Sequence, residues 1–149
     1  MATKDTSANT SHLIVRVLPR VVLSASVTAG LVIDAVVHLS VAADRDGIGG
    51  ALSEGNVFRI ESAVALLAAV LVLALPWRLV AYGVALVVAT SAFGAVMLYR
   101  YVNVGALGPL PNMYEPIWYH DKTVSAIAEL VAAVVAALAL GRLALRRSA

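Results

Sequence analysis

Four long apolar stretches dominate this chain of 149 residues, at about residues 21–43, 57–75, 79–98 and 123–140. About 20 consecutive apolar residues in a helix are enough to cross the hydrocarbon core of a lipid bilayer. A helix also satisfies its own backbone hydrogen bonds, which lipid cannot do. The sequence therefore predicts an all-α fold, an integral membrane four-helix bundle that forms one domain and has the lipid bilayer as its partner.

The composition agrees with this prediction and excludes several other functions. Hydrophobic residues make up 61% of the chain and charged residues 13%, whereas a soluble domain carries about 25% charged residues. The chain has no cysteine, which excludes disulfide exchange, thiolate nucleophiles and every Cys-based cofactor. We find no basic patch with interleaved aromatic residues, so we expect no nucleic-acid partner.

The segments outside the apolar stretches complete the expected organisation. Residues 1–20 are predicted as a cytoplasmic tail and interfacial segment, in which residues 1–11 are disordered and residues 12–20 form a short helix on the membrane surface. Residues 21–140 form the four-transmembrane-helix domain. Residues 141–149 are predicted as a basic cytoplasmic tail.

Basic residues are distributed unevenly between the two sides of the expected membrane. One side holds Lys4, Arg16, Arg20, Arg78, Arg142, Arg146 and Arg147, and the other side holds Arg45, Arg59, Arg100 and Lys122. Cytoplasmic loops of membrane proteins carry the excess of lysine and arginine. We therefore expect both termini in the cytoplasm and a multi-pass protein of the cell membrane.

Four ionisable residues, Asp34, His38, Glu61 and Glu129, lie inside or at the edge of the apolar stretches. An ionisable side chain at membrane depth costs a few kcal/mol or more, so it suggests a functional site. Asp34 and His38 are four residues apart and therefore share one face of a helix. All four residues lie roughly 6–13 Å inside the outer ends of their spans, at a rise of about 1.5 Å per residue. We predict that they meet in a polar pocket in the outer half of the bundle.

Residues at the outer rim are expected to complete this pocket. Arg59, Arg100 and Tyr101 are predicted to contribute to it, with the two arginines pairing with its carboxylates. The connection 99–122 above it is rich in proline and aromatic residues, and we interpret it as a compact outer lid loop. The lid candidates are Tyr114, Trp118, Tyr119 and His120.

Three interpretations of the polar pocket are open at this point. In the first, its residues are structural and hydrogen-bond across helices, each bond contributing on the order of 1 kcal/mol. In the second, zinc, manganese or non-haem iron binds to His38, Asp34, Glu61 and Glu129, or His38 ligates a haem with His120 as a distant second ligand. In the third, Asp34, His38 and the tyrosines relay protons or ions, or bind a quinone. No motif decides whether the protein is an enzyme.

Three segments carry a resemblance to known proteins: DAVVHLSVAA, SEGNVFRIESAVALLAA and YRYVNVGALGPLPNMYEPIWYHDKTVSAIAE. They resemble segments of uncharacterised small four-helix membrane proteins of high-GC actinobacteria. In topology the chain is also similar to the DoxX-like group of four-helix proteins, some of which are linked to thiol or quinone redox chemistry. The resemblance implies a four-helix fold and assigns no functional residue.

Together these features predict a small integral membrane protein that is an accessory protein or subunit of a membrane complex. A redox complex is the candidate for that larger assembly. Stripes of small residues along the spans are typical of helix–helix contacts in lipid, so we expect a homo-oligomer or a larger membrane-complex partner. One alternative is a self-sufficient redox protein that binds haem, a metal or a quinone. The other alternative is a small proton- or ion-coupled transporter.

Overall fold

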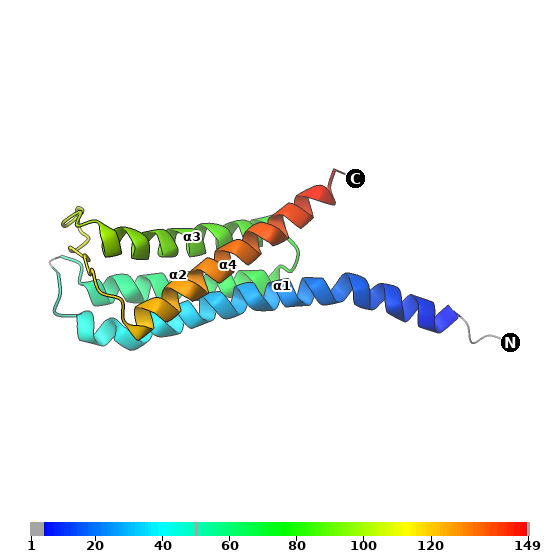
Figure 1. Ribbon diagram of the computed structural model, residues 1–149, viewed down its shortest axis with the longest axis horizontal. Helices are drawn as coiled ribbons and strands as arrows, with labels where there is room; N and C mark the ends of the chain where they lie inside the picture. The colour runs from blue at the N-terminus through cyan, green and yellow to red at the C-terminus, as the bar shows by residue number, and fades with distance from the viewer. Residues whose placement is uncertain (1–4, 50, 149) are drawn as a thin grey trace.

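The protein is all-helical in the computed structural model, which describes residues 5–49 and 51–148, with side chains from Leu18 onward. Its elements are α1 (Asp5–Ala42), the short 3-10 helix η1 (Ala43–Arg45), α2 (Glu54–Ala74), α3 (Leu79–Tyr101) and α4 (His120–Leu145) (Figure 1). No β-strand occurs in the described part of the chain. The predicted all-α fold is therefore confirmed.

All four helices are long and apolar enough to cross a membrane. The candidate spans are Leu18–Arg45, Glu54–Ala74, Leu79–Tyr101 and His120–Leu145. Their order and approximate positions agree with the four stretches that the sequence predicts. This confirms four helices of membrane-spanning length and hydropathy, as expected of a multi-pass membrane protein.

The helices extend beyond several of the predicted ends. The backbone is helical from Asp5, where we expected a tail followed by a separate interfacial helix, and residues 1–4 lie outside the described residues. Pro19 lies inside α1 and does not begin a new helix. The connection above the pocket spans only residues 102–119, because α3 continues to Tyr101 and α4 begins at His120.

The four helices form an up-and-down bundle (Figure 1). Helix α1 packs against α2 and α4, and α3 packs against α4 and less extensively against α2. The α2–α3 turn and the end of α4 lie at the same end of the bundle as the first half of α1, which we call the terminal end. Residues 43–49, 51–53 and 102–119 lie at the opposite end, which we call the loop end.

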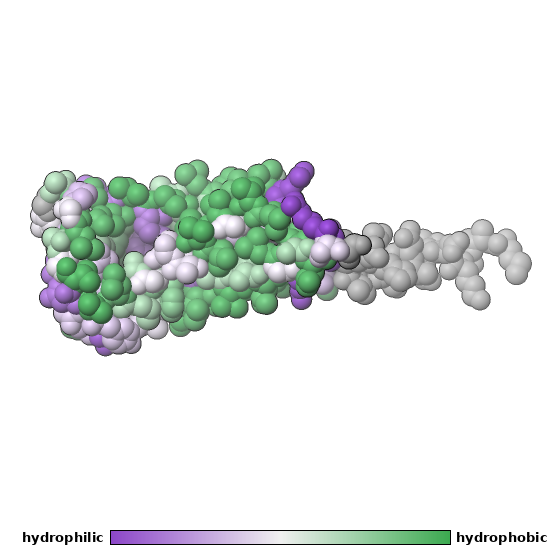
Figure 2. Space-filling view, turned by 90° about the horizontal axis from the view of Figure 1, so that it is seen from above, coloured by the Kyte–Doolittle hydropathy of each residue, from purple (hydrophilic) through white to green (hydrophobic). Residues whose placement is uncertain are grey.

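Small residues form the interior of the bundle. Its buried apolar residues are mostly alanines, with Val27, Leu31, Val72 and Tyr82 as the larger members. Large aliphatic side chains point outward instead, and Figure 2 shows them as a broad hydrophobic band around the bundle. This distribution is typical of helices in lipid, where small residues allow backbones to approach and the outer face needs no polar groups.

Gly30 marks a very close approach of α1 to α4. A Cβ atom added to Gly30 would lie 2.7 Å from the Ala128 carbonyl oxygen and 2.9 Å from the Ala132 Cβ atom. Asp34 follows Gly30 by one helical turn, and Glu129 follows Ala128 directly. The contact at Gly30 therefore determines how closely the carboxylates of α1 and α4 approach each other.

We expect Gly30→Ala to destabilise the bundle by about 1–3 kcal/mol, the usual cost of overpacking a core. The matched variant Gly83→Ala should be neutral or stabilising, because nothing lies within 4 Å of a Cβ atom at Gly83 and alanine favours a helix interior by about 0.5–1 kcal/mol. Unfolding of both variants in detergent micelles measures the difference. Equal stability of the two variants would contradict the close contact between α1 and α4.

Candidate functional site

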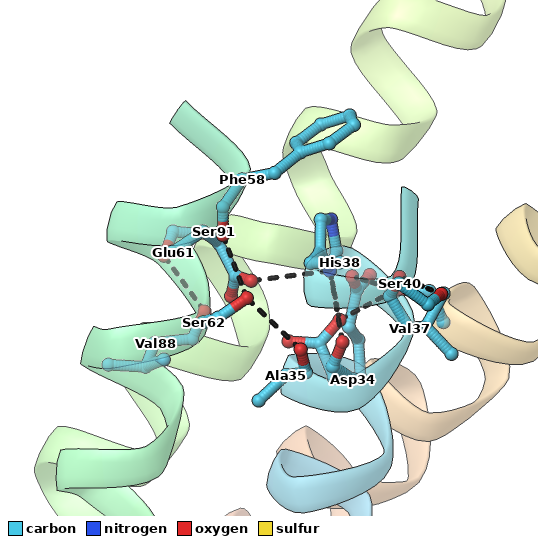
Figure 3. Close-up of polar contacts among 12 residues, drawn as sticks. Asp34, Ala35, Val37, His38, Ser40, Phe58, Glu61, Ser62, Val88 and Ser91 are labelled. Atoms are coloured by element: carbon cyan, nitrogen blue, oxygen red, sulfur yellow. Dashed lines mark hydrogen bonds and ion pairs between the residues drawn. The ribbon is translucent and has the colours of Figure 1, made fainter. Parts of the chain in front are cut away.

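Asp34, His38 and Glu61 meet near the loop end of the bundle (Figure 3). The His38 Nδ1 atom lies 2.9 Å from Asp34 Oδ1 and 3.3 Å from Glu61 Oε2. It also lies 3.1 Å from the Asp34 carbonyl oxygen. One possible ligand atom from each of the three residues lies within 4.8 Å of the other two. A single imidazole nitrogen therefore faces carboxylates from two different helices.

Local packing holds α1 and α2 together beside these residues. The Ser62 hydroxyl oxygen lies 3.1 Å from the Ala35 carbonyl oxygen and 2.8 Å from the Phe58 carbonyl oxygen, and its one hydrogen is shared between these two acceptors (Figure 3). The Phe58 ring meets the His38 ring edge-on, with ring centroids 5.0 Å apart. These contacts restrict the His38 ring to an orientation in which Nδ1 points toward the carboxylates.

Glu129 joins the group from α4 through Ser125. The Ser125 hydroxyl oxygen lies 2.6 Å from Asp34 Oδ1 and 2.9 Å from Glu129 Oε1. A hydroxyl group carries one hydrogen, so both contacts are hydrogen bonds only if one of the two carboxyl groups carries a proton. Asp34 and Glu129 are each only 1% exposed. We call Asp34, His38, Glu61, Ser125 and Glu129 the polar cluster.

The polar cluster holds more carboxyl groups than basic groups. It combines three carboxyl groups with one imidazole, and among the described residues its ion pairs are those of His38. Glu61 Oε1 and Glu129 Oε2 are buried without a hydrogen-bond partner in the described part of the chain, and Glu61 Oε2 has only its 3.3 Å contact with His38 Nδ1. Buried charges are costly unless they are paired or bind a metal. The cluster therefore needs added protons or a bound cation to be electrically balanced.

A cavity of ≈ 250 Å³ lies against the polar cluster. His38, Glu61 and Ser125 line it, whereas Asp34 and Glu129 lie behind them. Most other lining side chains are apolar, and these come from α1, α2, α3 and the connecting loop, whereas α4 contributes polar residues. The lining residues include Val37, Val41, Val57, Phe58, Ala92, Ala95, Val96, Tyr99, Leu110 and Met113. Hydrophilic residues are visible within the hydrophobic band near the loop end in Figure 2.

The cavity exists because α3 leaves the packed interior near the loop end. The buried residues of α3 all lie between Ala81 and Ala92, and none of the residues 93–101 is buried. The residues of α2 and α3 that line the cavity nevertheless follow helical periodicity, at positions 54, 57, 58 and 61 and at positions 92, 95, 96 and 99. Each helix therefore presents one continuous face to the cavity.

A network of charged residues closes the cavity at the loop end. The Arg45 guanidinium group donates to the Glu54 carboxylate at 3.1 Å and to the Glu115 carboxylate at 2.8 Å. The Lys122 ammonium group donates to the Glu115 carbonyl oxygen at 2.6 Å. Tyr119 lies beside Arg45, and burial raises the pKa of its phenol. We call these five residues the lid clamp, because they tie loop 102–119 to α2 and α4.

Arg59, Arg100 and Tyr101, which we predicted in the pocket, are not among the residues that line the cavity. Arg59 pairs with Asp46 at 2.5 and 2.8 Å, which lowers the pKa of the Asp46 carboxyl group. The Arg100 guanidinium group lies 5.0 Å from the centroid of the Tyr101 ring, and Tyr101 is 64% exposed. Arginine side chains, and the side chain of Tyr101 at the end of α3, are long enough to turn away from the bundle. The spacing of residues along a helix does not predict which way such a side chain turns.

The predicted lid residues are placed differently from one another. Tyr119 lines the cavity, but Tyr114, Trp118 and His120 do not. Trp118 lies under Arg100, with its ring centroid 5.7 Å from the guanidinium carbon. His120 is exposed at the start of α4. The loop covers the cavity mainly with Leu110, Met113 and Glu115, which our sequence analysis did not single out.

Sequence reasoning also missed the lid clamp and the role of Ser125 as a bridge. The spacing of Ser125 and Glu129, four residues apart on a helix, was the available signal for the bridge. No comparable signal exists for Arg45, Glu54 and Glu115, because these residues come from three separate segments. Their contact depends on the way the loops fold over the bundle.

Comparison of the chain with protein-family models, with curated proteins and with solved structures gives no match. The resemblance to small actinobacterial membrane proteins and to the DoxX-like group therefore stays a prediction. The functional argument depends on the site itself.

We expect Arg45→Gln to release the loop from the bundle, because Glu54 is 5% exposed and would lose its charged partner. An unsatisfied buried group costs about 1–3 kcal/mol, which corresponds to hydrogen exchange about 5- to 160-fold faster in residues 102–119. The matched control is Arg59→Gln, because Arg59 pairs with the exposed Asp46 outside the lid clamp. Equal exchange in the two variants would show that the lid clamp does not hold the loop.

Proposed function

We propose that the protein binds a divalent transition-metal ion within the bundle, on His38, Asp34 and Glu61, beside a pocket for a small apolar molecule. The observation that carries this proposal is the convergence of an imidazole nitrogen and two carboxylates from α1 and α2, with their ligand atoms within 4.8 Å of one another. This is the metal-binding form of the self-sufficient site that the sequence offered as an alternative.

The charge of the polar cluster supports a cation. Three carboxyl groups, two of them buried, lie near one imidazole. The nearby arginines pair elsewhere, Arg45 with Glu54 and Glu115 and Arg59 with Asp46. A divalent ion would balance two carboxylates and give the buried oxygens of Glu61 a partner.

The donor set indicates the class of metal. One imidazole with carboxylates suits zinc, manganese and iron(II), whereas copper(I) and iron–sulfur clusters prefer sulfur ligands. Ligand atoms around such an ion lie about 2.0–2.2 Å from it, so the three side chains need only small movements from their present spacing. Ser125 and Glu129 hold Asp34 in place from α4, as partners outside the metal ligands commonly do.

The geometry disfavours a haem. The cavity of ≈ 250 Å³ is below the range of about 300–1,000 Å³ that holds drug-sized ligands, and a haem is larger still. His120, the predicted second ligand, does not line the cavity.

The position of the cavity supports a metal site that acts on a second molecule. His38 and Glu61 belong both to the ligand set and to the cavity lining. Three protein ligands leave coordination positions open, as in catalytic metal sites. The aliphatic lining of the cavity favours a small molecule that is mostly apolar. The side chains of the polar cluster at one side of the cavity favour a molecule with an oxygen or nitrogen atom that the ion can bind. A metal ion bound there would act as a Lewis acid and polarise an oxygen atom of the small molecule.

The predicted orientation, location, partners and transport activity of the protein remain proposals beside the proposed metal site. The excess of basic residues at the terminal end supports cytoplasmic termini in a cell-membrane protein. The exposed aliphatic faces of the helices are compatible with lipid, with a second copy or with a larger complex in which the chain is an accessory subunit. A proton- or ion-coupled transporter has less support, because the polar residues gather at the loop end and do not line a path through the bundle.

Elemental analysis of the detergent-purified protein tests the proposal. We expect one zinc, manganese or iron ion per chain, and loss of most of it in His38→Ala. Adding the ion at 100 times its dissociation constant should stabilise the metal-free protein by about 2.7 kcal/mol. The matched control is His120→Ala, because His120 is exposed and lies outside the polar cluster.

A folded wild-type protein that neither contains nor binds any of these ions would overturn the proposal. Binding that survives in both His38→Ala and Glu61→Gln would place the ion elsewhere. If His38→Ala does not fold, Glu61→Gln keeps the test valid, because Glu61 lies at the cavity and is only partly buried.

A further inference from the structure

Trp77 contacts two arginines at the terminal end of the bundle. The Arg20 guanidinium carbon lies 5.3 Å from the centroid of the Trp77 ring, and the Arg146 guanidinium carbon lies 6.0 Å from it. The three residues come from α1, from the α2–α3 turn and from the end of α4. The turn therefore brings together two basic residues that are far apart in the sequence.

The backbone at Trp77 is held in an unusual conformation. Its φ angle of 63° makes Trp77 the one non-glycine residue with positive φ among the described residues. The ring also packs against Tyr82, with centroids 5.8 Å apart, and the Tyr82 hydroxyl lies 2.6 Å from Ser24 Oγ. A bulky residue with positive φ is strained, and these contacts on α1 and α3 hold the indole where both arginines reach it.

The arginines at this end have no acidic partners among the described side chains. Ion pairs of the described residues all lie at the loop end and in the polar cluster. The Nε atom of Arg20 is buried without a hydrogen-bond partner. Arg78, Arg142 and Arg147 add positive charge nearby in sequence, and Figure 2 shows hydrophilic residues where the hydrophobic band ends on this side.

We propose that Arg20 and Arg146 together bind the phosphate group of an anionic phospholipid, with Trp77 beside them at the membrane–water interface. Guanidinium groups form paired hydrogen bonds with phosphate oxygens. Basic pockets between transmembrane helices are known to bind anionic headgroups, and tryptophan is enriched at the level of the headgroups. The acyl chains of the same lipid would lie along the apolar outer face of the bundle.

This lipid site is independent of the proposed metal site, because it lies at the opposite end of the bundle. It gives the terminal end a preference for the leaflet that is richer in anionic lipids. The positive charge of this end therefore does more than orient the chain, because two of its arginines are positioned for one headgroup.

Thermal unfolding in phosphatidylcholine vesicles, with and without phosphatidylglycerol, tests the proposal. We expect phosphatidylglycerol to raise the unfolding temperature of the wild type, and the double variant Arg20→Gln/Arg146→Gln to bind it about 30-fold more weakly. That factor corresponds to about 2 kcal/mol, at about 1 kcal/mol per arginine near an anionic surface. The control Arg59→Gln changes an arginine at the loop end and should respond to phosphatidylglycerol as the wild type does.

Three outcomes would overturn the proposal. The first is equal stability of the wild type with and without phosphatidylglycerol. The second is an undiminished response in the double variant, or in Arg20→Lys/Arg146→Lys if the glutamine variant does not fold, because lysine cannot form the paired hydrogen bonds. The third is equal stabilisation by inorganic phosphate, which would make a free anion the ligand.

Discussion

The close contact between α1 and α4 is the interaction on which the rest of the structure depends. Lipid provides no hydrophobic force between helices, so the bundle relies on small residues that let backbones touch. Gly30 fits against Ala128 and Ala132 where no Cβ atom would fit. One turn further along, the same approach brings Asp34 and Glu129 to the two sides of the Ser125 hydroxyl. Tight apolar packing thus positions the most deeply buried carboxyl groups.

The polar cluster lies where this packing ends. Helix α3 contributes buried alanines only as far as Ala92, and beyond it a cavity separates the helices. The loop end then closes over the cavity through Arg45, which pairs with Glu54 and Glu115. Buried charge, open space and a charged cover therefore occur together. A purely structural set of hydrogen bonds would not need the cavity, which is why we favour a binding site.

The two ends of the bundle use arginine in different ways. At the loop end, Arg45 and Arg59 are bound to carboxylates of the same chain. At the terminal end, Arg20 and Arg146 stack on Trp77 and have no carboxylate among the described side chains. The first arrangement closes the protein, and the second leaves charge available to an anion from the surroundings. The same residue type thus has an internal role at one end and an external role at the other.

The sequence by itself determined the four helices and the inward face shared by Asp34 and His38, because apolar length and helical periodicity are local properties of the chain. It did not determine the partners of the long charged side chains. Arg59 and Arg100 were expected in the pocket, yet they contact Asp46 and Tyr101. Only the tertiary structure decided these contacts, the cavity and the lid clamp. The physical reason is that they depend on where helices diverge and how loops fold back, which are relations between distant segments.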